Sequence, residues 1–194
     1  MKTRHVPLLR RRRAGATDYR TRKRAITSQR PLLVMRVSNK NVTAQFVKPT
    51  VKGDLVLSSS HSRELARLGW LGSSKATPSC YLLGLLAGKK ALAAGIKEAV
   101  VYNGLVPFIA GSRIAAILKG VVDAGVSVPV GEEAFPSEDR LTGKFIADYA
   151  AKMASEDKDA YNRSFSALIK SGFKPETYPS AFAKAKVTVM EGKE

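Results

Sequence analysis

Cysteine and histidine are both scarce in this sequence. The chain of 194 residues contains one cysteine, Cys80, and two histidines, His5 and His61. A single cysteine cannot form an internal disulfide, and no pair of these residues has the spacing of zinc ligands. The composition therefore excludes a disulfide-stabilised domain and fits a reducing cytosol. A lone cysteine within a helix is more often buried packing than a nucleophile.

Long hydrophobic runs are missing as well. The longest lie around Tyr81–Ala87 and Val121–Val122, far short of the roughly 20 residues that cross a bilayer. The N-terminus has no apolar segment of the secretory kind. Its arginine-rich start is similar to a transit peptide, but the block Arg10–Arg13 interrupts the amphipathic pattern that such peptides need. We therefore expect a cytoplasmic protein with no membrane partner.

Acidic residues are too few to balance the basic ones. The chain has 16 Asp and Glu against 33 Lys and Arg, which gives a net charge of +17. Residues 1–30 carry +10, residues 31–131 carry +8 and residues 132–194 carry −1. This distribution indicates a polyanionic partner that is bound by the first two-thirds of the chain.

The shortage of acids also bears on catalysis. Between residues 31 and 131 the acids are Asp54, Glu64, Glu98 and Asp123, each at a turn or at the end of an expected element. A two-metal nuclease needs clustered carboxylates, so a metal-dependent nuclease is the weaker alternative. Gly84–Lys90 matches a phosphate-binding loop poorly, because its spacing is one residue short and no Ser or Thr follows the first lysine. We expect no enzyme activity, no metal, no cofactor and no small-molecule substrate.

The basic residues gather in an N-terminal arm. Residues 10–24 read Arg-Arg-Arg-Arg-Ala-Gly-Ala-Thr-Asp-Tyr-Arg-Thr-Arg-Lys-Arg. Adjacent guanidinium groups repel one another, and phosphate oxygens neutralise them. Gly15 permits a turn, Thr17 and Asp18 can form local hydrogen bonds, and Tyr19 offers a ring face to a base or to a core. A short helix over Tyr19–Ile26 is compatible with the pattern. A disordered tail or a targeting signal is the alternative, but the ordered interior favours an arm that folds on RNA.

The hydrophobic pattern after Pro31 predicts an α/β fold. Residues 32–37, 42–47 and 55–60 have the pattern of three antiparallel strands in a meander, and a polar connection follows over residues 61–77. Thr77 as a cap and Pro78 in the first turn predict a helix that runs to about Ala94 and ends at Gly95. A strand at residues 98–103, a helix at 112–124 and a strand at 126–130 complete the pattern. We therefore expect a mixed sheet, an antiparallel meander followed by βαβ-type units, with helices packed on it.

Three segments make up the expected organisation: a basic arm (1–30), an α/β core (31–131) and a helical C-terminal extension (132–194). Helices are expected from Pro136 onward, over Asp157–Lys170 and over Pro175–Ala185. Aromatic residues recur at helical spacing in this extension, and we interpret them as core seams rather than as platforms for base stacking. They include Phe145, Tyr149, Tyr161 and Phe165.

Polar and basic residues occupy the expected turns of the core, where side chains can reach a ligand. Ser112 and Arg113 start a helix, and free amides at a helix N-terminus suit phosphate. Trp70 either covers the core or stacks on a base, and the core is favoured because large aromatic residues are usually mostly buried. The candidate loop residues are Asn39, Lys40, His61, Arg63, Trp70, Lys75 and Arg113.

These motifs together resemble one family. They are Arg-Arg-Arg-Arg-x-Gly-x-Thr-Asp-Tyr-x-x-Arg at 10–22, Val-Ser-Asn-Lys at 37–40, His-Ser-Arg-Glu-Leu at 61–65 with Gly-Trp at 69–70, Thr-Pro-x-x-Tyr-Leu-x-Gly-Leu-Leu-Ala-Gly at 77–88, Gly-Ser-Arg at 111–113 and Pro-Ser-Glu-x-Arg at 136–140. In order and spacing, over nearly its whole length, the chain resembles the archaeal and eukaryotic type of the universal large-subunit ribosomal protein that binds 5S rRNA, the bacterial L-eighteen equivalent. Its length resembles that of the archaeal members.

The resemblance implies a structural role without catalysis. Members of this family dock 5S rRNA onto the large-subunit rRNA in the central protuberance, beside another 5S-binding ribosomal protein. The sequence departs from the family pattern at two places. Ala16 stands where a basic residue is common. The segment Leu105–Ile109 is apolar where relatives often carry His or Arg, so this segment could contact protein instead of RNA. An RNA-binding module that acts outside the ribosome remains the alternative. The residues assigned to RNA are Arg10, Arg11, Arg12, Arg13, Thr17, Asp18, Tyr19, Arg22, Arg24, Asn39, Lys40, His61, Arg63, Lys75 and Arg113.

Overall fold

A four-stranded mixed sheet lies at the centre of the computed structural model, which describes residues 7–50 and 52–192. The strand order is β3-β2-β1-β4. Strands β1 (Leu32–Val37), β2 (Val42–Thr50) and β3 (Gly53–His61) form an antiparallel meander, and β4 (Val100–Val101) pairs parallel to β1. The predicted α/β fold with a mixed sheet is therefore confirmed.

Alternation of side chains gives the sheet two different faces. Leu33 and Met35 of β1 and Ala44 and Phe46 of β2 point into the main core, and all four are buried. Leu32, one residue out of phase with them, points to the opposite face. The alternation of side chains along each strand thus decides which residues face the helices on either side of the sheet.

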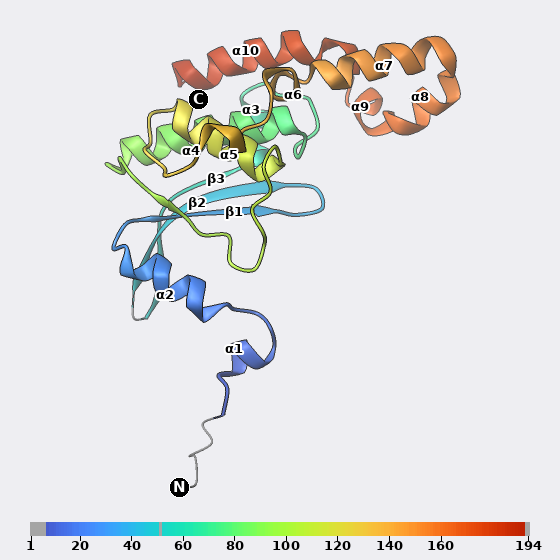
Figure 1. The fold of residues 1–194 in the computed structure, drawn as a ribbon. Coiled ribbons are helices and arrows are strands. Elements are labelled where there is room, and N and C mark those ends of the chain that lie inside the picture. Colours follow the sequence, from blue (N-terminus) through green and yellow to red (C-terminus); the bar gives the residue numbers. More distant parts are fainter. Residues whose placement is uncertain (1–6, 51, 193–194) are drawn as a thin grey trace, which may run out of the picture.

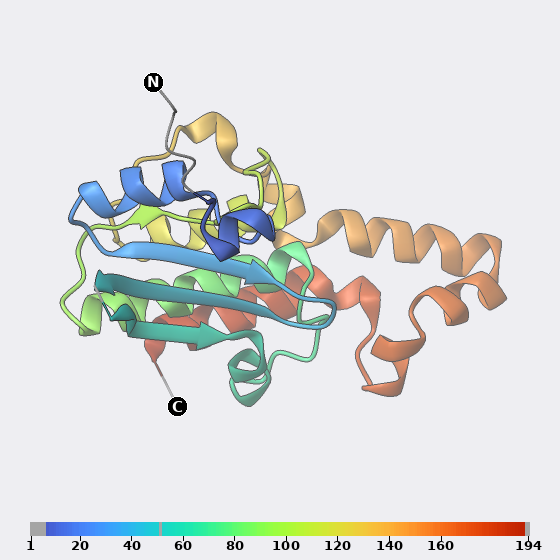
Figure 2. The same ribbon diagram turned by 90° about the horizontal axis from the view of Figure 1, so that it is seen from below.

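Helices cover the two faces unequally. Figure 1 shows α4 (Thr77–Ala93) and α5 (Arg113–Asp123) side by side on one face, with α10 (Tyr178–Glu191) forming a further layer above them. The other face carries α2 (Tyr19–Thr27), whose buried Ala25 packs with Leu32 and Val47. Figure 2 shows that α2 follows the β1 side of this face and leaves β3 and most of β2 uncovered.

Glycines bring α4 and α5 into direct backbone contact. A Cβ atom added at Gly84 would lie 2.1 Å from the carbonyl oxygen of Ile117, and one added at Gly120 would lie 2.3 Å from the carbonyl oxygen of Tyr81. Both glycines are buried in regular helix. The two helices pack this closely only because neither position carries a side chain.

The helices that follow α5 form the C-terminal extension. Figure 1 shows α7, α8 and α9 projecting beyond the sheet, while α10 returns across α4. Gly143 joins α6 to α7 with a φ of 83°, and a Cβ there would lie 3.0 Å from the ring of Pro78. The elements after α5 are η1 (Glu132–Ala134), α6 (Glu138–Thr142), α7 (Lys144–Glu156), α8 (Lys158–Ser164), α9 (Ser166–Lys170) and η2 (Pro175–Thr177).

Aromatic residues connect this extension to the core. Trp70, Phe173 and Tyr178 form one cluster, with ring centroids 5.0 to 6.2 Å apart. Trp70 is 4% exposed, and its indole N–H donates to the Ser79 hydroxyl at 2.8 Å. The interpretation of Trp70 as a core residue is therefore confirmed. The division of the chain at residues 30 and 131 stays a prediction.

Several details of the predicted elements were wrong. The segment 61–77 is not only a polar connection, because it contains α3 (Ser62–Arg67). The strand expected at 98–103 is reduced to β4, and the strand expected at 126–130 is a single bridge between Ser127 and Glu98. Thr77 does not cap α4, since Ala76 holds the cap position without a side-chain bond. The helix expected over Asp157–Lys170 is broken into α8 and α9 at Phe165.

Candidate nucleic-acid interface

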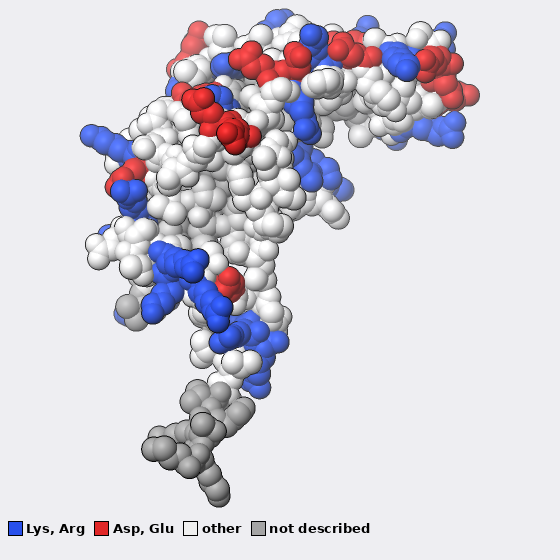
Figure 3. Space-filling view, viewed as in Figure 1, with Lys and Arg blue, Asp and Glu red and all other residues white. Residues whose placement is uncertain are grey.

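The arginine block forms a short exposed helix, α1 (Arg10–Arg13). All four side chains are exposed to solvent. The Nε of Arg11 donates to the hydroxyl of Thr17 at 2.8 Å, and within residues 7–50 and 52–192 no carboxylate pairs with any of the four guanidinium groups. Figure 3 shows basic side chains gathered over the region of α1 and α2. Four unneutralised guanidinium groups in one helix form a surface for an external polyanion.

A glycine turn and an aspartate cap join α1 to α2. Gly15 has a φ of 62°, which favours glycine. The Asp18 carboxylate accepts from the Arg20 N–H at 2.9 Å and from the Thr21 hydroxyl at 2.6 Å, and this bond from Thr21 is the main reason why the pKa of Asp18 lies below its usual value. Asp18, which the sequence assigned to RNA, thus has a structural role as the N-cap of α2.

Arg22 anchors the arm to the sheet. Its guanidinium donates to both carboxylate oxygens of Asp54, at 3.1 and 2.5 Å, and lies 5.7 Å from the centre of the Tyr102 ring. The bonds to Asp54 raise the pKa of Arg22. Arg22 is therefore engaged within the protein and orients α2, and a contact of this side chain with RNA stays a prediction. Arg24 on the same helix is exposed, and Tyr19 is half-buried.

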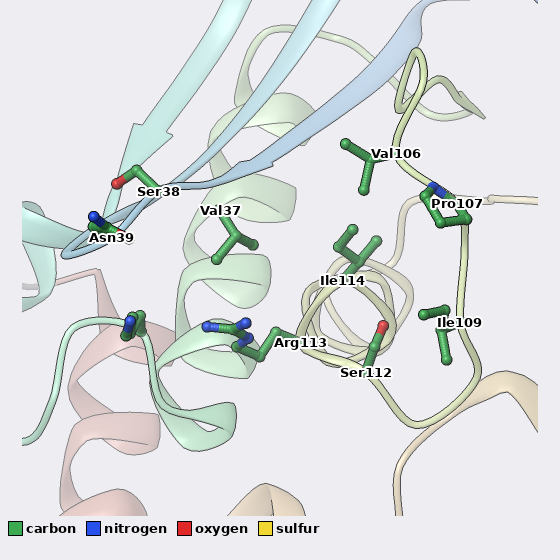
Figure 4. Close-up of a pocket in the computed structure, with 10 residues that line it drawn as sticks. Val37, Ser38, Asn39, Val106, Pro107, Ile109, Ser112, Arg113 and Ile114 are labelled. Atoms are coloured by element: carbon green, nitrogen blue, oxygen red, sulfur yellow. The ribbon is translucent and has the colours of Figure 1, made fainter.

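Three of the predicted loop residues meet around one cavity of about 610 Å³. Asn39 comes from the turn between β1 and β2, Lys75 from the loop before α4, and Arg113 from the first turn of α5. Figure 4 shows Arg113 pointing from the start of α5 towards the turn that carries Asn39. We call Asn39, Lys75 and Arg113 the loop cluster.

The cavity combines cationic and apolar walls. Lys75 and Arg113 are the charged residues among the ten that line it, and no carboxylate is present in the lining. Ser112 caps α5, with its hydroxyl accepting from the Ala115 N–H at 3.4 Å. An anion here meets two cations and a helix N-terminus, which act in the same direction. Apolar side chains of the 104–111 loop and of Ile114 form the opposite wall (Figure 4).

His61 and Arg63 lie away from this cavity, at the start of α3. The Nδ1 atom of His61 accepts from the Arg63 N–H at 3.1 Å, and the Glu64 carboxylate accepts from the His61 N–H at 3.0 Å. These reciprocal bonds form a capping box. Glu64 also forms an ion pair with Lys90. His61 is thus a helix cap, and the side chain of Arg63 is exposed; an RNA contact stays a prediction for both.

Sequence reasoning missed the residues that hold these surfaces in place. Asp54 on β3 and Tyr102 just after β4 position Arg22, and no local motif marks either one. The apolar segment 105–109, a departure from the family pattern, has strongly exposed side chains: Leu105 56%, Val106 55%, Phe108 42% and Ile109 63%.

Within residues 7–50 and 52–192, no group of three His, Cys, Asp or Glu side chains could hold a metal ion. In the same part of the chain, no helix is long and apolar enough to span a membrane.

Comparison with known proteins decides the family. A family model described as "Ribosomal large subunit proteins 60S L5, and 50S L18" matches residues 3–102. The large ribosomal subunit protein uL18 of Thermofilum pendens (strain DSM 2475 / Hrk 5) is 42% identical over 186 residues, which cover 96% of this chain and 94% of the relative. The chain belongs to the uL18 family of ribosomal proteins. It is a cytoplasmic, rRNA-binding component of the large ribosomal subunit, of the archaeal type.

The two basic surfaces lie within the part of the chain that the comparisons cover. The matched range 3–102 contains the arm, Asn39 and Lys75, and the alignment with the archaeal uL18 relative extends over nearly all of the remaining chain. The uncompensated arginines of α1 and the loop cluster thus belong to a protein whose partner is ribosomal RNA.

Proposed function

We propose that this protein binds 5S rRNA and docks it onto the large-subunit rRNA in the central protuberance, beside another 5S-binding ribosomal protein, without catalytic activity. The observation that carries the proposal is the exposed arginine block of α1, which finds no carboxylate within the described chain. Only an external polyanion neutralises it. Family membership makes that polyanion ribosomal RNA.

The arm and the loop cluster offer two kinds of contact. In α1, arginine forks can bridge phosphates of neighbouring RNA strands, because each guanidinium donates in two directions. At the loop cluster, Asn39 adds an amide that can bond to a base edge or a 2′-hydroxyl. The arm then contributes affinity, and the cluster contributes shape and specificity.

The apolar loop beside the loop cluster suits contact with a neighbouring protein. The exposed apolar side chains from Leu105 to Ile109 lie beside the loop cluster and carry no charge. A contiguous apolar loop of this kind suits the surface of a second protein better than it suits phosphates. We assign this loop to the protein neighbour in the central protuberance.

The test is binding to 5S rRNA and to an unrelated structured RNA of equal length, across a range of salt concentrations. If about eight phosphates are neutralised, log affinity should fall against log salt with a slope of roughly −6. Replacing Arg10, Arg12 and Arg13 by Gln should make this slope less steep by about 2. The matched control replaces Lys158, Lys170 and Lys184, three exposed lysines of the C-terminal extension, by Gln and should leave it unchanged.

The outcomes separate the alternatives. Preference for 5S rRNA that is weakened by the arm variant and not by the control supports the proposal. Equal affinity for both RNAs, or a slope near zero, overturns it. A module that acts outside the ribosome would fail to co-sediment with large subunits in high salt. A nuclease would degrade the RNA in a reaction that a chelator stops.

A further inference from the structure

A second hollow, of about 900 Å³, lies between the core and the C-terminal extension. One side is formed by the loop 71–76 and the turn at Asn39 and Lys40, and the other side by α7 and α9. We call this hollow the aromatic groove. It is open to solvent along its length and separates the projecting helices from the sheet.

Two exposed aromatic side chains line the groove from α7. Phe145 and Tyr149 are each 57% exposed. They are four residues apart, so they lie on the same face of α7. The prediction that they form a core seam was therefore wrong, because their helix turns this face to the groove rather than to the core. Exposed rings at adjacent helical positions form a flat apolar wall that water solvates poorly.

The opposite side of the groove is rigid. The backbone N–H of Ser73 donates to the hydroxyl of Tyr178 at 3.0 Å. Gly72 lies against the Trp70 ring so closely that an added Cβ would lie 2.6 Å from it. The Ser79 hydroxyl also donates to the carbonyl oxygen of Ser73. The loop is thus held in one position by buried groups, and the groove exists before any ligand arrives.

The charges at the groove are of one sign. Lys40 and Lys75 are the charged residues in its lining, and no carboxylate lines it. Figure 3 shows basic side chains in the angle beneath the extension and acidic ones on its upper side. Asn39 and Lys75 also line the cavity of the loop cluster. The aromatic groove is therefore continuous with the surface to which RNA was assigned above.

We propose that the aromatic groove holds an unpaired nucleotide of 5S rRNA, with its base stacked on Phe145 and Tyr149 and its phosphate beside Lys40 and Lys75. This inference rests on the proposed function, because it extends the loop cluster along the same RNA. Unpaired bases splayed from an RNA loop are recognised by stacking on aromatic side chains combined with a cationic track for the backbone. An apolar helix of a protein partner would leave both lysines without a counter-charge.

The central experiment measures 5S rRNA affinity of the full-length double variant Phe145→Ala/Tyr149→Ala. Loss of the stacked base should weaken binding about tenfold. The salt dependence should stay unchanged, because the variant removes no charge. Conservative replacement by Phe145→Tyr and Tyr149→Phe should keep the affinity of the unaltered protein. The matched control is Val187→Ala, which shortens a 55% exposed side chain on α10 far from the groove and should have no effect.

Ultraviolet cross-linking of the complex provides a second readout. Zero-length cross-links should form between 5S rRNA and peptides that contain Phe145 or Tyr149. Equal melting temperatures of the variants would show that the fold is intact.

Unchanged affinity of the double alanine variant, together with no cross-link in α7, would overturn this inference. If the α1 arginine variant still loses affinity in that case, the proposed function stands without the groove. If neither variant loses affinity, the proposed function falls as well. Loss of a neighbouring protein from assembled subunits, without loss of 5S rRNA affinity, would assign the groove to protein and also overturn the inference.

Discussion

The contact between α4 and α5 allows a prediction with a defined magnitude. An alanine methyl at Gly84 would lie 2.1 Å from the Ile117 carbonyl oxygen, which is 1.3 Å less than the 3.4 Å of ordinary contact. The neighbour is backbone in the middle of a helix and cannot rotate away. Overpacking typically costs about 1–3 kcal/mol, and the helix propensity of alanine returns about 1 kcal/mol. With the upper end of that cost, Gly84→Ala should destabilise the protein by about 2 kcal/mol.

Gly88 provides a comparison one helical turn later. Its added Cβ would lie 2.5 Å from the Cβ of Ala124, while the next neighbour, the Val121 carbonyl oxygen, is 3.2 Å away. Here the obstacle is one methyl group and can be removed. Gly88→Ala should destabilise the protein, and the double variant Gly88→Ala/Ala124→Gly should recover most of the loss.

Urea unfolding followed by far-ultraviolet circular dichroism measures these differences. A loss of about 2 kcal/mol should also lower the melting temperature by roughly 4–8 °C for a chain of this size. The reasoning is refuted if Gly84→Ala leaves stability unchanged or raises it, because propensity would then outweigh the clash. It is also refuted if Ala124→Gly fails to rescue Gly88→Ala, because the stated neighbour would then not be the cause.

Three further outcomes are expected. Burial raises the pKa of the Cys80 thiol to about 12, so a soluble disulfide reagent at pH 8 should modify it only after unfolding, and rapid labelling of the folded protein would contradict this. The bond from the Thr21 hydroxyl lowers the pKa of Asp18. The Asp18 cap of α2 should therefore contribute its full stability above about pH 4, the usual pKa of Asp, and lose it as the pH falls through the lowered pKa. Carbon chemical shifts of α2 residues, measured against pH, should report this loss. Asp54→Asn weakens a partly exposed ion pair with Arg22, which is worth about 1 kcal/mol or less. The melting temperature should therefore change little, while trypsin should cleave within α2 faster. An unchanged cleavage rate would show that the pair does not anchor the arm.

Elements with a strong periodic pattern and a clear end could be predicted from the sequence. The run at 32–37 is apolar with β-branched residues and the run at 42–47 alternates, and the structure pairs them in full register from Leu32 with Val47 to Val37 with Val42. The helix beginning at residue 77 was predicted to end at Gly95, which has a φ of 79°. Local chemistry decides such features, so a single sequence contains them.

Other features depend on partners that are distant in the chain. Helix α3 is capped by the ring nitrogen of His61 rather than by a typical capping residue. The valine-rich segment after Gly125 contributes buried Val126 and Val128 to the core but forms only one bridge of strand type. The hydrophobic composition of this segment indicates that it is buried. A strand also needs a neighbouring strand to pair with, and the two-residue β4 is too short to provide one.

The candidate site divides in the same way. Residue type and position indicated that Asn39, Lys75 and Arg113 lie in turns, and the fold brings them to one cavity. Arg22 is of the same residue type as the nearby arginines of the arm, but it pairs with Asp54, which lies on β3. Among the arginines of the arm, only the tertiary structure shows which one pairs with a carboxylate on the sheet.

The exposed edge of the sheet links the charge of this protein to its solubility. Strand β3 lies at one end of the sheet, and its Leu55, Val56 and Leu57 are 56%, 48% and 39% exposed. An uncovered edge with apolar side chains is a template for pairing with another chain. Between free copies, the net charge of +17 opposes that encounter. The repulsion acts over about 10 Å at 0.1 M salt and only about 3 Å at 1 M, so the high salt that strips RNA from the protein also removes the barrier that keeps bare copies apart.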